Sequence, residues 1–484
     1  MELKTVLNKI KEYSLINPNK LAVIDTSTEL SYKQYYAKIT SIAYFLKNEL
    51  NIAKGEYVII KNSQDVKYLS VIHGIQLMGA VPVPLEKSVN EGRVIEIVEQ
   101  TKSKLFLGDI KIDKIECYTI DYIFNCKDAY YDFSLPKLDD EAMVLFTTGT
   151  TGRSKGIVLE YIAEYATAEN ITVGVEMKKD NIELIPMPMN HSFSLRRYFA
   201  NMINGSTVIV IDGVFFVKIL FNMIEKYDVT SLALVPAAIS IIFKLTRDKI
   251  SDYKNQLDYI QFGSAPIPEI DKKHLIDILP NTRMYNIYGS TEMGCACILN
   301  FASKDNMPSC IGYPAKNSIF KIIDENGNEK NSTLTEPGFI SYSGTMKMKG
   351  YLNNKELTEK TIINDFLVST DLGYKDEYGR IFMLGRNDDV ILSGGNKISP
   401  LEVEELARKF KGVNDCICKG RKEKIVEFVP VLYIVADDEL DDVALLNYLK
   451  NNLEDFKLPK DIIKINSVPR TYNGKVDRKA EINT

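Results

Sequence analysis

The sequence has little histidine and cysteine, and it lacks the spacing of a metal site. Its 484 residues include three histidines and seven cysteines. Cys295 and Cys297 form one Cys-x-Cys pair and Cys416 and Cys418 form another, but neither pair has further ligands at zinc spacing. An odd number of cysteines in a long chain is also a poor basis for a disulfide framework. We therefore expect reduced, mostly buried cysteines, as in proteins of the cytosol.

The sequence also lacks an excess of one charge and a hydrophobic run long enough for a membrane helix. Its 60 basic and 65 acidic residues give a net charge of -5, and the basic residues are scattered, which does not favour a nucleic-acid partner. Residues 1–20 are charged and lack the apolar core of a secretion signal. The most apolar stretches, 207–224 and 231–243, are interrupted by charge or proline. We expect buried elements there, no membrane span and a cytoplasmic protein.

What the sequence does contain is an alternation of short apolar runs with longer amphipathic segments. The length allows two or three structural units, one of them with a large core. Strands that alternate with helices produce a largely parallel sheet covered by helices. The predicted strands are 21–24, 57–61, 80–84, 142–147, 183–187, 207–211, 232–235, 259–262 and 284–287. The predicted helices are 33–50, 63–78, 213–226, 237–245 and 269–279.

The last hundred residues have a different pattern. After Arg386 we expect a Gly-Gly turn, a helix at 400–410, strands near Cys416 and at 429–435, and a helix at 441–452. This is a reasonable size for a small domain. The predicted fold is therefore α/β, with a large N-terminal domain of helix-covered β-sheets (residues 1–385) and a small α+β C-terminal domain (residues 386–484).

A loop rich in glycine and hydroxyl groups follows the strand predicted at 142–147. It reads Thr147-Thr148-Gly149-Thr150-Thr151-Gly152-Arg153-Ser154-Lys155-Gly156. The glycines let the backbone approach a ligand closely, and the hydroxyls and the lysine can donate to phosphate oxygens. Its glycine spacing is not that of a Walker A loop. From these residues alone, a phosphate loop and a flexible surface loop both stay open.

The decapeptide resembles the phosphate loop of the adenylate-forming superfamily. That superfamily includes acyl-CoA and aryl-CoA synthetases, the adenylation domains of nonribosomal peptide synthetases, and beetle luciferases. Its other motifs follow in the same order over nearly the whole chain, and the likeness is closest to the acyl and aryl acid ligases. It implies that the phosphates of ATP are bound by Thr147, Thr148, Gly149, Thr150, Thr151, Gly152 and Lys155. Ser154 replaces the usual proline, which should alter the stiffness of the loop and leave the phosphate ligands in place.

Two further segments resemble the part of the family site that holds adenine and the metal. The segment from Phe262 to Pro266 resembles the turn along the adenine, which implies adenine contacts from Gly263, Ser264 and Ala265. The segment from Tyr285 to Glu292 resembles the family's Tyr-Gly-x-Thr-Glu motif. By that resemblance Tyr288 stacks on the adenine beside Gly289, Thr291 binds the α-phosphate and Glu292 holds Mg²⁺. An aromatic face suits a purine, and a carboxylate suits a hard cation.

The segment from Phe366 to Gly373 resembles the part that binds ribose, with Asp371 accepting from both hydroxyls. Thr370 stands where the family usually has glycine. Arg386, at the domain junction, is implied to reach the ribose or the phosphates.

The remaining motifs resemble those that move between the two half-reactions. The likeness makes Asp388 the hinge about which the small C-terminal domain rotates, so that domain is expected to be mobile. It places Gly394, Gly395 and Lys397 along the path of the thiol. It also makes Lys475, in the segment from Pro469 to Arg478, the lysine that bridges the carboxylate and the phosphate.

The segment from Met187 to Phe193 resembles the lining of the acyl pocket. No Asp or Glu occurs between residues 186 and 198, so an α-amino acid is disfavoured because its ammonium would lack a partner. His191 matches the histidine of aryl- and acyl-CoA ligases, with a packing residue as the alternative. The predicted pocket residues Met189, His191, Phe193 and Met293 favour an aromatic or medium aliphatic acid.

These motifs predict an AMP-forming carboxylate–thiol ligase. With ATP and Mg²⁺ it would make an acyl-adenylate and pass the acyl group to CoA, or alternatively to the phosphopantetheine of a carrier protein. Lys475, Thr291, Glu292 and His191 are the predicted catalytic residues. The basic segment from Lys419 to Lys424, expected at a hairpin tip, is either a solvated turn or a contact for those anionic acceptors. A luciferase-like oxygenase and a degenerate nucleotide-binding protein are weaker alternatives, since no oxygen site is visible and the ATP motifs are present.

Overall fold

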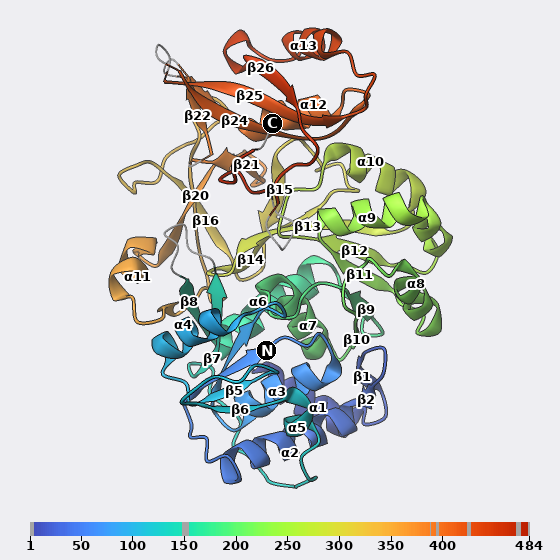
Figure 1. Cartoon of the computed structure of the whole chain (residues 1–484), viewed down its shortest axis with the longest axis vertical. Helices are drawn as coiled ribbons and strands as arrows, with labels where there is room; N and C mark the ends of the chain where they lie inside the picture. The colour runs from blue at the N-terminus through green and yellow to red at the C-terminus, as the bar shows by residue number, and fades with distance from the viewer. Residues whose placement is uncertain are drawn as a thin grey trace.

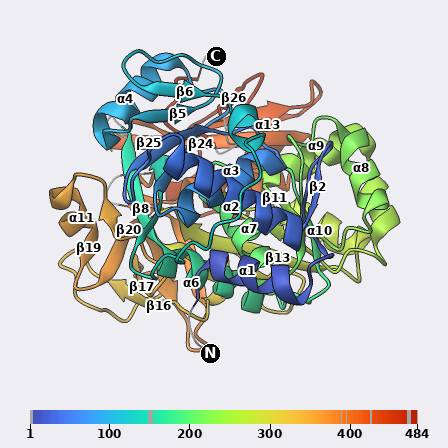
Figure 2. The same ribbon diagram turned by 90° about the horizontal axis from the view of Figure 1, so that it is seen from below.

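The computed structural model describes residues 4–147, 154–387, 389–393, 396–423, 427–470 and 476–482. The N-terminal helices and the C-terminal sheet lie at opposite ends of the longest axis, and the yellow strands of the middle of the chain lie between them (Figure 1). Seen from below, the first helices, α1 (Val6–Ile16), α2 (Tyr32–Asn48) and α3 (Val66–Leu77), cover one end of the molecule (Figure 2).

Buried strands form the parallel part of the central sheet. Their order is β10 (Thr207–Val210), β9 (Ile182–Ile185), β11 (Ser231–Leu234), β12 (Tyr259–Phe262) and β13 (Arg283–Ser290), and each pairs in parallel with the next. Beyond β10, β1 (Leu21–Ile24) continues the parallel pairing and β2 (Glu29–Ser31) follows antiparallel. Every residue of β10, β11 and β12 is buried, as near-continuous apolar runs predict for strands covered on both faces.

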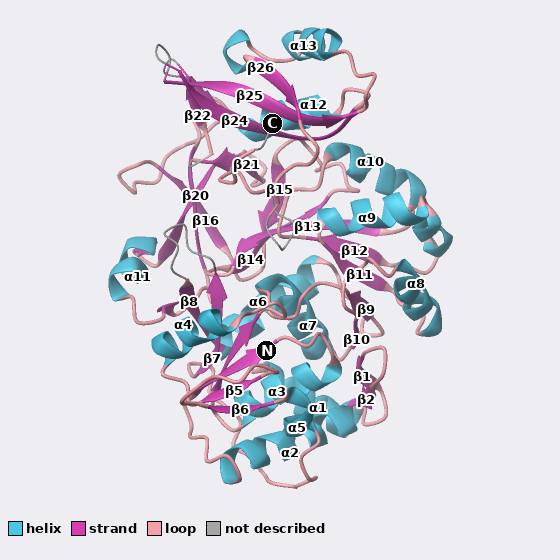
Figure 3. Ribbon diagram, in the orientation of Figure 1, coloured by secondary structure: helices cyan, strands magenta, loops and turns pink. Residues whose placement is uncertain are grey.

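Helices cover these strands on both sides (Figure 3). α6 (Tyr161–Gly174) packs against α7 (Ser192–Asn204), and α7 packs on β9 and β10. α8 (Val217–Lys226), α9 (Pro236–Thr246) and α10 (Glu269–Ile278) flank the other side. The elements predicted between residues 183 and 287 are confirmed with small shifts at their ends. The start of α8 at Val217 differs most, because Gly213 has φ +79° in the turn before it.

Beyond β13 the sheet becomes antiparallel and carries the rest of the nucleotide motifs. The order continues through β14 (Gly294–Asn300), β15 (Cys310–Pro314), β21 (Ile381–Arg386), β20 (Phe366–Lys375), β17 (Gly338–Ser343) and β16 (Ile319–Ile323). The short β19 (Ile362–Ile363) pairs with β20, after helix α11 (Lys355–Thr361). In this register Asp371 on β20 is the direct partner of Arg386 on β21.

The strand predicted at 142–147 exists, but it is not part of the parallel sheet. It is β7 (Glu141–Thr147), which pairs antiparallel with β8 (Lys155–Glu160), and β18 (Gly350–Tyr351) pairs with β8. The expectation from the alternating pattern was wrong here. The connection from Thr147 to Lys155 is too short for the crossover that a parallel pair needs.

A smaller parallel sheet lies near the N-terminus. Its order is β4 (Val81–Leu85), β3 (Tyr57–Lys61), β5 (Leu105–Leu107) and β6 (Glu116–Tyr118). Helices α4 (Glu91–Thr101) and α5 (Ile120–Phe124) belong to the same part of the chain, and β4 packs against β7. The elements predicted at 21–24, 33–50, 57–61, 63–78 and 80–84 are all found within a few residues of their expected ends.

The end of the chain forms a separate sheet with its own core. This sheet comprises β22 (Ile391–Ser393), β23 (Asn396–Ile398), β24 (Val413–Glu423), β25 (Glu427–Ala436) and β26 (Asp461–Lys464). Helices α12 (Pro400–Arg408) and α13 (Asp442–Lys450) pack on it and share its core. The basic segment is not simply a hairpin tip, because Lys419 to Glu423 belong to β24 and Arg421 pairs with Asp461.

These sheets and helices confirm the predicted fold class, a mixed α/β chain with a large sheet-rich N-terminal part and a smaller C-terminal part. All seven cysteines are free thiols, and each except Cys117 is buried. Within the described ranges, none of the helices combines the length and the apolarity that crossing a membrane requires.

Candidate active site

The hairpin between β13 and β14 places the Tyr-Gly-x-Thr-Glu motif at the carboxyl end of the parallel strands. Ligands of open α/β sheets commonly bind at this edge. Gly289 must be glycine here, because a Cβ would lie 1.9 Å from the carbonyl oxygen of Gly294. Gly294 itself has φ +76°, and a Cβ there would lie 2.3 Å from Oγ1 of Thr167. The sequence thus forces a tight hairpin that presents Thr291 and Glu292.

The predicted adenine and ribose residues come together beside this hairpin. The Tyr288 hydroxyl donates a hydrogen bond to Oδ2 of Asp371. Burial, helped by Tyr342 and Asp371, raises the pKa of Tyr288 well above its usual value, so the hydroxyl stays a donor. Tyr342 meets the Tyr288 ring edge-on, with centroids 6.1 Å apart. Tyr288 and Asp371, 83 residues apart in the chain, therefore share one site.

Thr370, the residue that departs from the family pattern, holds Arg386 next to Asp371. Its Nη2 donates to Oγ1 of Thr370 at 3.0 Å, and its Nε lies 3.9 Å from Oδ1 of Asp371. The backbone N–H of Asn387 donates to the carbonyl of Thr370 at 2.7 Å. The Thr370 hydroxyl thus anchors the Arg386 guanidinium. A glycine at this position has no side chain and could not do so.

Thr291 and Glu292 each contact a side chain that the sequence analysis did not single out. The Ser192 hydroxyl lies 3.1 Å from Oγ1 of Thr291. The Tyr351 hydroxyl donates to Oε1 of Glu292 at 3.1 Å. Nζ of Lys155, at the end of the phosphate loop, lies 5.8 Å from the centre of the Tyr351 ring. Tyr351 therefore links Lys155 to Glu292, and no local sequence pattern marks it.

Glu292 is the residue that the family resemblance assigns to Mg²⁺. Its Oε1 accepts from Tyr351, while Oε2 forms no hydrogen bond with the part of the chain that the structure describes. Mg²⁺ is commonly held by one or two carboxylates together with substrate phosphates. Across the same described residues there is no cluster of three or more His, Cys, Asp or Glu that could hold a metal ion. A single carboxylate beside a phosphate loop fits this mode of binding.

The predicted adenine turn touches the predicted acyl pocket. A Cβ on Gly263 would lie 2.4 Å from Cε2 of Phe193, so this glycine is required by close packing against the first turn of α7. Ser264 has φ +70°, in the left-handed region. His191 is the half-buried N-cap residue of α7. Met189 and Met293 are fully buried in the main core.

Arg196, one turn further along α7, was also missed by the sequence analysis. Its Nη2 donates to the carbonyl oxygens of Ser290 at 2.6 Å and Thr291 at 3.1 Å. With Ser192 it lines a cavity of about 20 Å³, room for roughly one water molecule. The only sequence signal was a basic residue in a segment otherwise taken to line an apolar pocket.

Several predicted residues lie outside the described residues. These are Thr148, Gly149, Thr150, Thr151 and Gly152 of the phosphate loop, Asp388, Gly394, Gly395 and Lys475. Thr147 ends β7, Lys155 begins β8, and Lys397 belongs to β23. Their predicted roles remain predictions.

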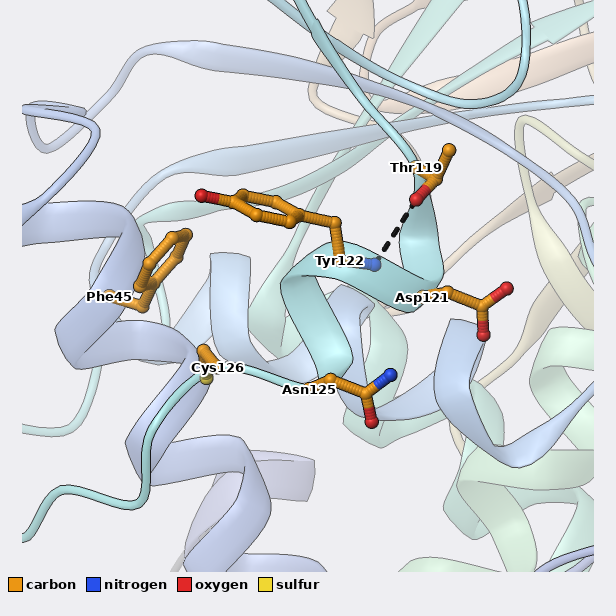
Figure 4. Close-up of a pocket in the computed structure, with 6 residues that line it drawn as sticks. All are labelled: Phe45, Thr119, Asp121, Tyr122, Asn125 and Cys126. Carbon is orange, nitrogen blue, oxygen red and sulfur yellow. Dashed lines mark hydrogen bonds between the residues drawn. The ribbon is translucent and has the colours of Figure 1, made fainter.

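A surface hollow of about 470 Å³ lies away from these motifs, next to α5 (Figure 4). Its lining residues are Phe45, Thr119, Asp121, Tyr122, Asn125 and Cys126. The one charged group there, Asp121, already pairs with Lys67. The hydroxyl of Thr119 accepts from the Tyr122 backbone as a helix cap. The polar groups of this hollow thus serve the start of α5 and an ion pair. The candidate site therefore remains at the β13–β14 hairpin.

Comparison with known proteins agrees with this geometry. The 2-succinylbenzoate–CoA ligase of Bacillus cytotoxicus is 24% identical over 490 residues, which covers 99% of this chain and 98% of the relative. The o-succinylbenzoate CoA synthetase MenE of Bacillus subtilis, solved with its acyl-adenylate intermediate, superposes with a TM-score of 0.87 at 22% identity over the whole of both chains. ATP-bound MatB of Rhodopseudomonas palustris gives a TM-score of 0.90 at 21% identity, over 98% of this chain and 97% of its own.

Family profiles account for most of the sequence. The profile of the AMP-binding enzymes matches residues 12–352, and that of the AMP-binding enzyme C-terminal domain matches residues 402–475. The first match spans more than half of the chain and contains the phosphate loop and the Tyr-Gly-x-Thr-Glu hairpin. The predicted resemblance is confirmed: this chain belongs to the AMP-binding enzyme family, within the adenylate-forming superfamily.

Proposed function

We propose that this enzyme joins a carboxylic acid to CoA in two steps, through an acyl-adenylate. The observation that carries the proposal is the convergence of Tyr288, Asp371, Arg386 and Glu292 at one edge of the sheet, beside the end of the phosphate loop. Relatives over nearly the full length are named as acid–CoA ligases, and a structural neighbour was solved with an acyl-adenylate.

The nucleotide would be held by side chains whose contacts are already arranged for it. Asp371 would exchange its bond with the Tyr288 hydroxyl for bonds from the ribose hydroxyls, which two carboxylate oxygens can accept. Arg386, anchored on Thr370, would point its charge at the ribose or the phosphates. The Tyr288 ring and the Gly263–Ala265 turn would enclose the adenine. With this arrangement the α-phosphate would lie next to Thr291, as the family resemblance implies.

The first step needs charge screening more than it needs a general base. The carboxylate of the acid is already deprotonated at neutral pH, and its oxygen attacks the α-phosphorus while pyrophosphate leaves. Both reactants are anions, so fixed donors and cations around Thr291 lower the barrier. Lys155, Thr291 and, by the family resemblance, Lys475 would supply them. Mg²⁺ on Glu292 would screen the phosphates further when bound.

Ser192 would set the position of Thr291. The two hydroxyls lie 3.1 Å apart, so one donates to the other and the second proton remains available for a phosphate oxygen. The Tyr351 hydroxyl similarly fixes one oxygen of Glu292. Oriented donors of this kind do not have to reorganise during the reaction.

In the second step the thiol attacks the acyl carbon and AMP leaves. We propose that the C-terminal domain turns about Asp388 between the steps, so that Lys475 leaves the site and the loop at 394–397 lines the path of the thiol. The proposed acceptor is CoA and not a carrier protein, because the relatives described above are named for CoA.

The test is pyrophosphate release by the full-length enzyme with ATP, Mg²⁺ and hydroxylamine over a panel of acids. The panel contains 2-succinylbenzoate, benzoates, cinnamates, C4–C12 fatty acids and amino acids. We expect release with an aryl or aliphatic acid, and a thioester when CoA replaces hydroxylamine. Release without any thioester on CoA, but with one on a phosphopantetheine carrier, would correct the acceptor. No release with any acid would refute the proposed function.

A further inference from the structure

Arg196 projects from α7 toward the reacting end of the site. It lies one helical turn after Ser192, so both residues are on the same side of α7. Ser192 contacts the Thr291 side chain, and Nη2 of Arg196 contacts the Thr291 carbonyl at 3.1 Å. The guanidinium therefore stands within one side-chain length of the group assigned to the α-phosphate.

Most of the donors of this guanidinium are unused. Nη2 binds the two carbonyls, while Nε and Nη1 make no hydrogen bond with the residues that the structure describes. Arg196 also forms no ion pair with any of those residues. Its pKa is lowered to about 10 by burial, so it remains a cation at neutral pH. Arg196 is half-buried, so its remaining donors and its charge are accessible to an anionic ligand.

The neighbouring arginine shows what a structural arginine in this helix looks like. Arg197 is fully buried, and its Nε and Nη2 form a double hydrogen bond with the carboxylate of Glu183. Nη2 also donates to the Tyr259 hydroxyl at 2.9 Å. Among the described residues, Arg197 therefore has a carboxylate within hydrogen-bonding distance and Arg196 has none, although the charge of Glu292 acts on Arg196 from further away.

A second side chain without hydrogen bonds faces the same helix. Side chains of β12 alternate, so Tyr259, Gln261 and Gly263 share the face that meets α7, where Tyr259 contacts Arg197 and Gly263 contacts Phe193. Gln261 lies between those contacts and is fully buried. Within the described chain, neither its amide nitrogen nor its oxygen has a hydrogen-bond partner. Buried amide groups nearly always have hydrogen-bond partners. The Gln261 side chain therefore has a donor and an acceptor available for a polar group of a ligand.

We propose that Arg196 binds a second anionic group on the acid, so that the preferred substrates are dicarboxylic acids. The inference rests on the proposed function and replaces the purely apolar pocket that the sequence predicted. One carboxylate of the substrate lies at Thr291 and reacts, and the other pairs with the guanidinium and accepts a hydrogen bond from Nη1. Arginine is suited to this role because it stays charged at neutral pH and Nη1 carries two N–H donors.

The experiment compares acids that differ only in the second carboxylate, using wild-type, Arg196→Gln and Arg196→Lys enzymes. The pairs are glutarate with pentanoate, and 2-succinylbenzoate with its two mono-acid analogues, 4-oxo-4-phenylbutanoate and 2-butanoylbenzoate. Wild type should favour the diacid by about 10- to 100-fold in kcat/KM, the range of a charge-assisted hydrogen bond. Arg196→Gln should lower kcat/KM for the diacid more than for the mono-acids, through KM for the diacid, so that the preference is lost. Arg196→Lys should keep part of it.

The control is Arg247→Gln, an exposed arginine after α9 that should leave both acids unaffected. Equal activation of diacids and mono-acids by wild type would overturn the inference and leave the proposed function standing. A loss in Arg196→Gln that is the same for both acids, or that falls on KM for ATP, would show that Arg196 serves the hairpin or the nucleotide, and would also overturn it. No activity with any acid would refute the proposed function itself.

Discussion

Replacing Glu164 by Gln should stabilise this enzyme, and the gain should grow as the pH rises. Glu164 lies on α6 with its side chain buried, and burial raises the pKa of its carboxyl from 4.5 to about 8. Its oxygens accept from Nε2 of Gln76, which also donates to the carbonyl of Ala142 at 3.0 Å. Glutamine keeps an oxygen to accept that bond and carries no proton to lose.

Burial keeps the acid neutral, since the hydrogen bond from Gln76 acts in the other direction and lowers the pKa of Glu164. Oε1 of Gln76 accepts from Nδ1 of His73 at 2.7 Å, and Nε2 of His73 then accepts from the Tyr198 hydroxyl at 2.8 Å. This direction requires a neutral imidazole, and burial lowers the pKa of His73 to about 4. No cation among the described residues pairs with Glu164. The carboxyl is therefore held as a neutral acid, with its proton bound in the folded state.

The magnitude follows from the two pKa values of Glu164. Between pH 4.5 and about 8 the folded state holds a proton that the unfolded chain has released, so wild-type stability falls as the pH rises. The slope is about 1.4 kcal/mol per pH unit, and the accumulated loss at pH 7 is about 3 kcal/mol. Glu164→Gln does not titrate there. The free energy of unfolding of Glu164→Gln, relative to that of wild type, should therefore increase by about 2–3 kcal/mol from pH 5 to pH 7.

The assay is urea unfolding followed by circular dichroism at pH 5, 6, 7 and 8, since the chain has no tryptophan. Glu325→Gln, at an exposed turn residue, is the matched control and should track wild type at every pH. His73 titrates equally in all three proteins, so its contribution cancels. A stability difference between Glu164→Gln and wild type that does not change with pH would refute the assignment of a buried neutral acid.

The active site allows three shorter tests. Asp371→Asn should raise KM for ATP about 10- to 100-fold, because a neutral amide accepts the ribose hydroxyls less strongly, and it should leave KM for the acid unchanged in the pyrophosphate assay. An equal rise in both constants would mean that Asp371 supports the site as a whole. Gly289→Ala should destabilise the β13–β14 hairpin by about 1–3 kcal/mol and lower adenylation, since its Cβ meets the Gly294 carbonyl; an unchanged melting temperature and rate would contradict this. Lys475→Ala should lower adenylate formation about 100-fold or more while sparing thioester formation from a chemically prepared adenylate. Equal losses in the two half-reactions would remove Lys475 from the first step.

Much of the scaffold follows from local patterns. The strands from β9 to β13 are short apolar runs between amphipathic helices, and a chain with that order has few ways to bury them other than a covered parallel sheet. Gly289 is also understandable locally, because a Cβ there would meet the Gly294 carbonyl of the same hairpin, whereas the need for Gly263 comes from Phe193 on the distant helix α7. The family resemblance assigned Tyr288 to the adenine and Asp371 to the ribose, and the structure joins these two residues by a hydrogen bond.

Pattern reasoning failed where contacts between distant segments decide the outcome. An apolar run does not indicate which strand it will pair with. The sequence therefore predicted β7 as a strand, but not as a member of a separate antiparallel sheet. Ser192 and Tyr351 carry no local signal, and Arg196 is marked only as a basic residue near the predicted pocket segment. Their contacts arise only when α7 and β18 meet the β13–β14 hairpin.

The charge states of buried groups were beyond sequence reasoning for the same reason. Two adjacent arginines in α7 look alike in the sequence, yet one faces Glu183 and the other faces the site. In the sequence, Glu164 looks like an ordinary helix glutamate. Its pKa is raised because burial removes water from the carboxylate. Desolvation and pairing depend on all the elements packed around a side chain. The amino-acid sequence alone thus identified the family, most of the elements and the nucleotide motifs, whereas the tertiary structure decided which ionisable side chains pair with one another and which are kept neutral by burial.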